Sequence, residues 1–357
     1  MRRNRIIFIG IVGIALAIVA YSLLTGRGVE PVTGLVGSEK APFFEDARVQ
    51  QALRRHGLDV TVQKAGSREI ATSFDLSRYD FAFPSGAPAA EKIQRETGQS
   101  KTFTPFFTPM AIASWKPIAG LLVQQGIAQD HGAYYTVDMD ALLPLIQSQL
   151  RWKDIPGNQA FTANKSVLIT TTDVRKSNSA AMYLALMSYV ANQDDIVQTM
   201  SEAQPLMPLL TDMFLRQGLR PSSSLEPFED YLVKGMGHSP AVMVYEAQFI
   251  AQAALEDGSI QPDMVLMYPV PTIFTKHVFI PLSAGGEKLG EALTSDPELQ
   301  RLAVEFGFRT DDLAYFQEFT ASHGIALPES FVDVIEPPSY EVLEGMIQII
   351  EQAYEQQ

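Results

Sequence analysis

The sequence predicts an α/β protein built in two parts and preceded by an apolar N-terminal helix. Between residues 32 and 96, apolar segments of strand length and of helix length alternate, which indicates a parallel sheet with helices on its faces. A proline-rich string at 103–109 interrupts this alternation, and a second strand–turn–helix unit follows at 166–190. The chain opens with a long uncharged run at residues 6–24.

The individual elements follow from the spacing of apolar residues. Short apolar runs predict strands at 32–36, 58–62, 79–83, 110–115, 166–170, 241–246, 264–269 and 278–282. Helical spacing predicts helices at 43–56, 89–96, 137–150, 180–190, 247–255, 287–306 and 340–354, with one or two more between 196 and 217. Residues 221–227 begin and end with proline and are expected to form a loop.

The N-terminal apolar run has the length that a helix needs to cross a bilayer. Arg2, Arg3 and Arg5 precede it, and a basic flank stays in the cytoplasm, so the chain after the run should lie outside. A cleaved secretory signal is the competing interpretation, but the apolar core is long and residues 18–20 make a poor cleavage site. We therefore expect residues 1–27 to form a cytoplasmic stub and an uncleaved transmembrane anchor.

Charge and composition exclude several functions. The chain of 357 residues has a net charge of −14, and an acidic protein lacks the basic surface that nucleic-acid binding requires. It contains no cysteine, which excludes disulfides, thiolate zinc sites and a lipidated N-terminal cysteine. Its 46% hydrophobic and 19% charged residues are typical of a globular chain, and its length is sufficient for two domains.

A hydroxyl-rich turn lies between the predicted strand at 166–170 and the predicted helix at 180–190. Ser177, Asn178 and Ser179 suit the N-cap position, and their side chains can also hydrogen-bond a ligand. The first N–H groups of a helix lack partners and the helix dipole favours negative charge, so such a turn can hold an anion or a polar group. An ordinary capped helix explains the same residues, and both interpretations stay open at this point.

Other predicted strands also end in polar turns. Ligands of open α/β sheets bind beyond the carboxyl ends of strands, so these turns would form one cleft if they converge. Each turn taken singly has a simpler explanation, because Ser and Gly dominate turns. The candidate ligand-binding residues are Ser38, Ser85, Ser114, Thr172, Asp173, Ser177, Asn178, Ser179, Tyr245 and Glu246. Most are neutral donors that suit an oxyanion or a small polar solute, whereas a carboxylate would repel an anion or accept a hydrogen bond from an amine.

Residues suited to catalysis or metal binding are sparse. None of the five histidines has the spacing of a two-histidine metal site. Residues 235–239 lack the spacing of a dinucleotide loop or a nucleophile elbow, and the sequence contains no P-loop. Asp138 and Asp140 are not followed by a calcium-loop pattern and are explained as charges at a helix start. We therefore expect no catalysis, no cofactor and no metal.

Several strings, taken in order, resemble the type II periplasmic substrate-binding protein superfamily. The strings are Gly-Ser-Glu-Lys at 37–40, Asp-Phe-Ala-Phe-Pro-Ser at 80–85, residues 172–179, Met-Val-Tyr-Glu-Ala-Gln at 243–248 and Tyr-Pro-Val-Pro-Thr at 268–272, continuing through 276–282 to 307–309. The set is most similar to the solute-binding modules found beside von Willebrand factor A domains in bacteria, and the resemblance covers residues 32–320.

The resemblance implies two α/β lobes, a double-stranded hinge and a ligand held between the lobes. Lobe one would comprise residues 32–110 plus 262–357, and lobe two residues 111–255. The family's lipid-anchoring cysteine is absent from this sequence, and a transmembrane anchor would replace it. That departure argues against simple delivery of a solute to an ABC transporter.

Together these features predict a non-catalytic, membrane-anchored extracytoplasmic solute-binding protein that holds a small polar or anionic ligand. It would be a single-pass protein of the bacterial inner membrane, with its soluble domain on the periplasmic or extracellular side. Its partner would be a transporter or a von Willebrand factor A-type envelope complex. The alternative is a ligand-free binding-protein fold that serves as a docking or structural subunit of a cell-envelope complex. That alternative becomes the favoured interpretation if Ser85, Ser177 and Ser179 do not face one another.

Overall fold

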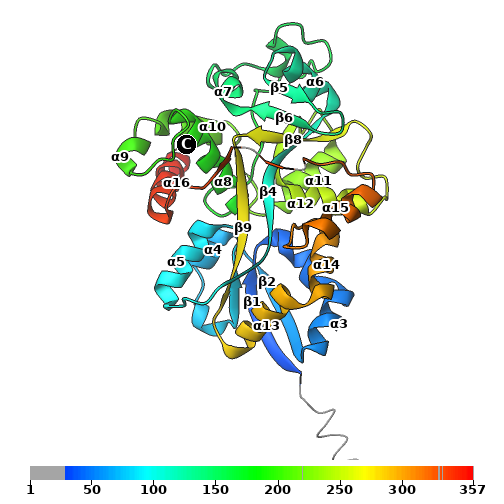
Figure 1. The fold of residues 1–357 in the computed structure, drawn as a ribbon. Helices are drawn as coiled ribbons and strands as arrows, with labels where there is room; N and C mark the ends of the chain where they lie inside the picture. Colours follow the sequence, from blue (N-terminus) through cyan, green and yellow to red (C-terminus); the bar gives the residue numbers. More distant parts are fainter. Residues whose placement is uncertain (1–28, 219, 329, 332, 357) are drawn as a thin grey trace, which may run out of the picture.

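A computed structural model of the chain describes residues 29–218, 220–328, 330–331 and 333–356, and these form two lobes joined by two long strands (Figure 1). The joining strands are β4 (Phe103–Trp115) and β9 (Thr272–Pro281), which pair in antiparallel fashion. The expected transmembrane anchor at residues 1–27 lies outside the described residues. Among the helices that are described, none is long and apolar enough to cross a membrane.

The lower lobe contains a sheet that is covered by helices on both faces. In it β1 (Glu30–Val36) lies between and parallel to β2 (Leu58–Lys64) and β3 (Phe81–Phe83), and the end of β9 pairs with β3. Side chains alternate between the two faces of a strand, and β1 has buried apolar side chains on both: Val32 and Val36 on one face, Leu35 on the other. Val32 and Val36 pack with α3 (Ala47–Arg55), α13 (Ala284–Ser295) and α14 (Pro297–Glu305), while Leu35 packs with α4 (Ser67–Thr72) and α5 (Ala87–Thr97).

The upper lobe is built on the second half of β4. That half pairs with β7 (Ala241–Tyr245) and β8 (Met264–Val270), and the sheet continues through β6 (Tyr135–Asp138) to β5 (Ala128–Asp130). The surrounding helices are α6 (Lys116–Gln124), α7 (Met139–Gln147), α9 (Met200–Ala203), α10 (Met207–Leu215), α11 (Leu225–Lys234) and α12 (Glu246–Ala254). Helix α8 (Asn178–Ala191) is buried almost all round, which is typical of a central core helix.

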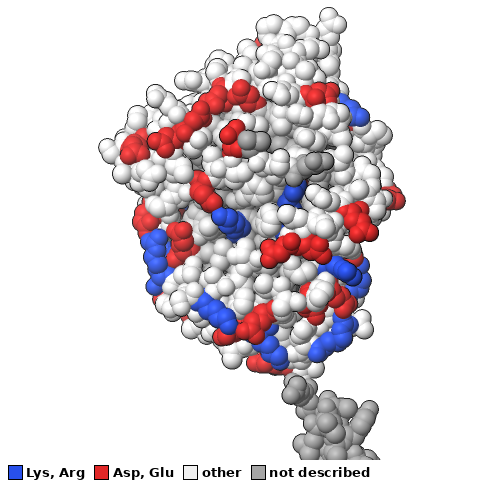
Figure 2. Space-filling view, in the orientation of Figure 1, with Lys and Arg blue, Asp and Glu red and all other residues white. Residues whose placement is uncertain are grey.

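The remaining elements are η1 (Ser38–Lys40), α2 (Ala41–Glu45), η2 (Leu76–Arg78), η3 (Trp152–Asp154), α15 (Leu313–Ser322), β10 (Val334–Ile335) and the C-terminal helix α16 (Tyr340–Glu355). On the face shown in Figure 2, basic and acidic side chains are interspersed over the lower lobe, whereas acidic ones predominate over the upper lobe.

Two of the predicted helices and one predicted strand are interrupted in the structure. The helix expected at 43–56 is divided at Asp46, where the backbone is extended. The Asp46 side chain caps α3 by accepting a hydrogen bond from Arg48 N at 2.7 Å. The helix expected at 287–306 is divided in the same way, at Asp296. The strand expected at 166–170 is not a continuous strand, because Ser166 bridges Arg151 whereas Thr170 bridges Val242.

The lobe boundary expected at residue 262 also differs from the packing. Strand β8 belongs to the sheet of the upper lobe, and α16 places Met346, Ile347 and Ile350 in that lobe's core. Both segments were expected in lobe one. An amphipathic helix packs on whichever apolar surface is within reach, and position along the chain does not identify that surface.

Candidate ligand-binding cleft

A small polar cavity lies between the two lobes. The lower lobe contributes Gly37, Ser38, Glu39, Ala65, Gly66, Ser67 and Ser85, and the upper lobe contributes Ser177, Asn178, Ser222, Ser224 and Tyr245. Its volume is about 10 Å³, which holds about one water-sized group. The lobes therefore meet closely around this cavity, and a larger ligand in it requires them to separate.

Helix N-termini from both lobes converge on this cavity. Ser177, Ser224 and Tyr245 are the N-cap residues of α8, α11 and α12, and Gly86, next to Ser85, is that of α5. The hydroxyls of Ser177 and Ser224 make no capping bond to the backbone of their own helices, and each lies within hydrogen-bond distance of another serine hydroxyl, that of Ser179 or Ser38. Unpaired N–H groups and the helix dipole make each such terminus favourable for negative charge.

Direct hydrogen bonds cross from one lobe to the other at the cavity. Ser38 Oγ and Ser224 Oγ are 3.2 Å apart, and Asn178 Nδ2 donates to the Ser85 carbonyl oxygen at 3.2 Å. Glycine permits this close approach. A Cβ atom on Gly86 would lie 2.0 Å from Asn178 Oδ1, so a larger residue would displace the Asn178 side chain that bonds across the cleft.

A buried charge cluster lies beneath the cavity. Lys40 Nζ donates to Glu39 Oε1 at 2.5 Å and to Ser85 Oγ at 2.8 Å, and Ser85 Oγ donates in turn to Glu39 Oε1. Burial lowers the pKa of Lys40, and the charge of Glu39 opposes that shift. The ammonium and the carboxylate together add no net charge to the cavity.

His277 connects this cluster to the hinge strands. Burial, together with the charge of Lys40, holds the pKa of His277 well below its ordinary value, so the ring is neutral near pH 7. Lys40 Nζ lies 3.0 Å from Nδ1, which is therefore the acceptor, and the ring hydrogen is on Nε2 facing Thr275 Oγ1 at 3.4 Å. Thr275 Oγ1 donates to the carbonyl oxygen of Thr108 on β4 at 2.8 Å.

Half of the candidate residues from the sequence line the polar cavity. These are Ser38, Ser85, Ser177, Asn178 and Tyr245. Tyr245 contributes its hydroxyl, which accepts a hydrogen bond from Asn178 Nδ2 at 3.2 Å. Two of the three serines chosen to discriminate between the functions, Ser85 and Ser177, thus line the same cavity.

The other five candidates do not line it. Ser179 Oγ lies behind Ser177, 3.1 Å from its hydroxyl and 2.8 Å from Thr172 Oγ1. Ser114 donates to the Pro240 carbonyl oxygen at 2.8 Å inside the upper lobe. The remaining two carboxylates form ion pairs, Asp173 with Arg175 and Glu246 with Arg309. These side chains bond their neighbours in the fold, which sequence spacing does not reveal.

Sequence reasoning missed Glu39, Ser67, Ser222 and Ser224 of the cavity. A signal was present for the last two, because a serine run followed by an apolar helical pattern is an N-cap signature. The prolines at 221 and 227 favoured a loop instead, although Pro227 is accommodated in the first turn of α11. Within the described part of the chain, no group of three or more acidic or histidine side chains is placed to hold a metal ion.

Three solved structures of similar fold are distant from this chain in sequence. The AfuA periplasmic binding protein from Actinobacillus pleuropneumoniae, with fructose-6-phosphate bound, is 10% identical with a TM-score of 0.56, over 90% of this chain and 97% of that chain. A periplasmic thiamin binding protein is 12% identical with a TM-score of 0.54, over 91% and 96%. Apo ferric ion-binding protein A of Pasteurella haemolytica is 11% identical with a TM-score of 0.53, over 91% and 96%.

No protein-family model and no curated protein sequence matches this chain. The structural likeness confirms the expected fold class, the two-lobed α/β fold of periplasmic binding proteins. At these sequence identities the structural likeness supports the fold alone, because proteins of one fold have many different functions.

Proposed function

We propose that this protein is an extracytoplasmic solute-binding protein that encloses a small polar or anionic ligand between its lobes without chemical change. The observation that carries the proposal is the convergence of four helix N-termini and a ring of hydroxyls on one inter-lobe cavity. Such termini attract negative charge, and Ser and Asn side chains add neutral hydrogen-bond donors.

The fold alone does not identify the ligand. The similar structures are a fructose-6-phosphate complex, a thiamin binding protein and the apo form of a ferric ion-binding protein, so their names give three unrelated ligand chemistries. The cavity favours an oxyanion or a neutral polar solute, because Lys40 balances the charge of Glu39 and the remaining lining is uncharged. Binding requires the lobes to open and close about β4 and β9, which is the hinge motion typical of two-lobed binding proteins.

Membrane anchoring belongs to the same proposal. The basic flank and the apolar run at residues 6–24 support a single-pass anchor in a bacterial inner membrane, with the two lobes outside. A transporter or a von Willebrand factor A-type envelope complex would then be the partner.

A thermal-shift screen tests solute binding. Residues 28–357 would be screened against sulfate, phosphate, molybdate, carboxylates, amino acids and sugars. A ligand at about a hundred times its Kd adds about 2.7 kcal/mol to the free energy of unfolding. In the variant Ser177→Ala with Ser222→Ala the shift should fall while the melting temperature without ligand stays close to that of the wild type. Ser148→Ala, at an exposed position on the upper lobe, is the control.

A second function is favoured by the closure of the cleft. The lobes already bond one another through Ser38–Ser224 and Asn178–Ser85, and the cavity between them is small. A ligand-free fold that acts as a docking or structural subunit would have these features. If no solute in the screen raises the melting temperature, and cross-linking in membranes recovers a specific partner, the docking function is supported instead of solute binding.

A further inference from the structure

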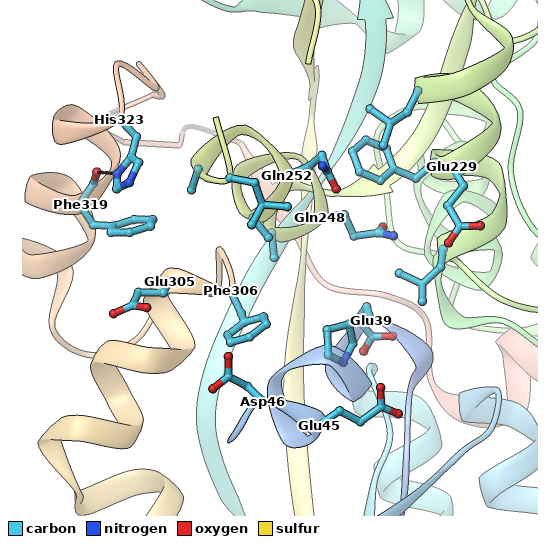
Figure 3. A pocket seen from close by; sticks show the side chains of 18 of the residues that line it. Glu39, Glu45, Asp46, Glu229, Gln248, Gln252, Glu305, Phe306, Phe319 and His323 are labelled. Carbon is cyan, nitrogen blue, oxygen red and sulfur yellow. Dashed lines mark hydrogen bonds between the residues drawn. The ribbon is translucent and has the colours of Figure 1, made fainter. Parts of the chain in front are cut away.

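A second and larger cavity, here called the vestibule, lies beside the polar cavity. Its volume is about 680 Å³, and Glu39 lines both cavities. The lower lobe contributes residues of η1, α2, α3 and α14, and the upper lobe contributes residues of α11 and α12 (Figure 3). A ligand in the vestibule would therefore touch both lobes.

The vestibule has the size and the lining of a small-molecule site. Pockets for small organic ligands have volumes of about 300–1,000 Å³ and are mostly apolar, with a few polar groups. Leu225 and Phe228 of α11, Ala251 of α12, Phe306 and Phe319 provide the apolar surface here. An inorganic ion alone would leave that surface in contact with water, so the lining favours an organic body.

The charged groups around this apolar surface are predominantly acidic. The carboxylates are Glu39, Glu45, Asp46, Glu229 and Glu305 (Figure 3), and Arg48 is the single arginine or lysine among the lining residues. Arg48 is already occupied, because it bonds both Asp46 at 3.1 Å and Glu305 at 2.5 Å. Lys40 pairs with Glu39 and Lys64 pairs with Glu45. Five carboxylates thus face three cations, and Glu229 is the one without an ion pair among the described residues, so the vestibule favours a cation over an anion.

Two of the carboxylates have unused capacity to accept hydrogen bonds. Glu39 is only 8% exposed, and all of its side-chain hydrogen bonds within the described residues go to Oε1, so Oε2 is left for the cavities. Glu229 lies on the exposed side of α11 and forms no ion pair within the described part of the chain. Glu39 Oε2 and the Glu229 carboxylate are both accessible from the vestibule, so a donor on a ligand can reach them.

We infer that the vestibule binds an organic ammonium ion, whose apolar body packs on Leu225, Phe228 and Phe306 and whose charged nitrogen faces Glu39 and Glu229. This site goes beyond the proposed function, because it takes a different chemical class in a different cavity. Since the vestibule is formed by both lobes, its ligand stabilises the closed arrangement.

Calorimetric titration of the purified full-length chain tests the inference. The probes are 2-phenylethylammonium and hexylammonium, with 2-phenylethanol as the neutral isostere and 3-phenylpropanoate as the anionic one. Both ammonium ions should saturate one site, and both isosteres should bind at least about tenfold more weakly, the ratio that corresponds to about 1.4 kcal/mol. Added salt should weaken ammonium binding, because the carboxylates at the rim are exposed.

Matched variants locate the site. Glu229→Gln should weaken ammonium binding by about threefold, the scale of an exposed ion pair. Glu226→Gln, on the same helix but outside the vestibule lining, should leave it unchanged. Ala251→Leu fills the vestibule from α12 and should reduce binding further, while circular dichroism and melting temperature report whether the variant is folded.

Several results would overturn the inference. One is binding of 2-phenylethanol as tight as that of its ammonium counterpart, and another is no saturation by either ammonium ion up to about 1 mM. Unchanged affinity in both Glu229→Gln and Ala251→Leu would also place the ligand elsewhere, and tight binding of a lysine-bearing peptide but of neither small amine would make the vestibule a protein-docking site. Ser177→Ala should not alter ammonium affinity, so failure of the oxyanion screen and failure of this test are distinguishable.

Discussion

Lys40 Nζ and His277 Nδ1 are 3.0 Å apart, although 237 residues separate them in the chain. Lys40 belongs to the turn beneath the polar cavity, and His277 belongs to the hinge strand β9. Through Thr275 and Thr108 the hydrogen bonds continue to the second hinge strand, β4. The groups beneath the cleft are therefore joined directly to the strands about which the lobes would move.

The neutral state of His277 predicts a pH dependence of stability. Its pKa is lower in the folded protein than the ordinary value near 6.5, so below about pH 6.5 the unfolded chain binds more protons and stability falls as the pH falls. The urea midpoint should therefore decrease between about pH 7 and pH 5, and it should decrease less in His277→Gln. The more exposed His131 provides the control variant His131→Gln, which should keep the full dependence. Identical slopes in the wild type and His277→Gln would contradict the prediction.

The Glu246–Arg309 pair should contribute strongly to stability. Arg309 Nε lies 2.7 Å from Glu246 Oε2, and Tyr268 OH donates to Glu246 Oε1 at 2.6 Å, all in a buried environment. Glu246→Gln leaves a buried guanidinium without its charge partner and should lower the free energy of unfolding by about 3–5 kcal/mol in urea titrations. Glu298→Gln removes an exposed partner of Arg55 and should change it by less than about 1 kcal/mol. Equal losses in the two variants would refute the assignment.

Asn178 should help to hold the lobes together. Its amide donates across the cleft to the Ser85 carbonyl oxygen and, within the upper lobe, to Tyr245 OH. Asn178→Ala removes both bonds, so we expect a larger radius of gyration by small-angle scattering and a loss of about 1 kcal/mol in stability. Asn192→Ala, which loses only a local bond to the Asp195 carbonyl oxygen, should scatter like the wild type. A wild-type radius in Asn178→Ala would show that closure does not depend on this side chain.

Helix α16 should link the lobes through Arg68. The helix packs in the core of the upper lobe, and its Glu344 bonds Arg68 of α4 in the lower lobe at 2.7 and 2.9 Å. This pair is partly buried and makes two parallel contacts, so a double-mutant cycle of Arg68→Ala and Glu344→Ala should give a coupling energy of about 1.5–3 kcal/mol. The exposed pair Arg95–Glu341, which joins α5 to the same helix, should give less than about 1 kcal/mol. A larger coupling for the exposed pair would contradict the ranking.

The candidate site was predictable where its signals are local. Ser177 and Asn178 were identified because a hydroxyl-rich turn precedes an apolar helix, and such a turn is encoded within about ten residues. Ser85 and Tyr245 were identified at the ends of strands β3 and β7. Ser114 satisfied the same criterion but lies within the upper lobe, because the end of β4 faces Pro240 rather than the cleft.

The sequence by itself determined the alternation of strands and helices, the fold class and the short polar turns that begin α5, α8 and α12. These depend on period, propensity and capping, which act between residues close in the chain. Only the tertiary structure decided that Lys40 meets His277, that Glu246 pairs with Arg309 instead of facing a ligand, and that α16 packs on the upper lobe. Those relationships join residues far apart in sequence, and they are selected by burial and by partner satisfaction, which no local pattern records.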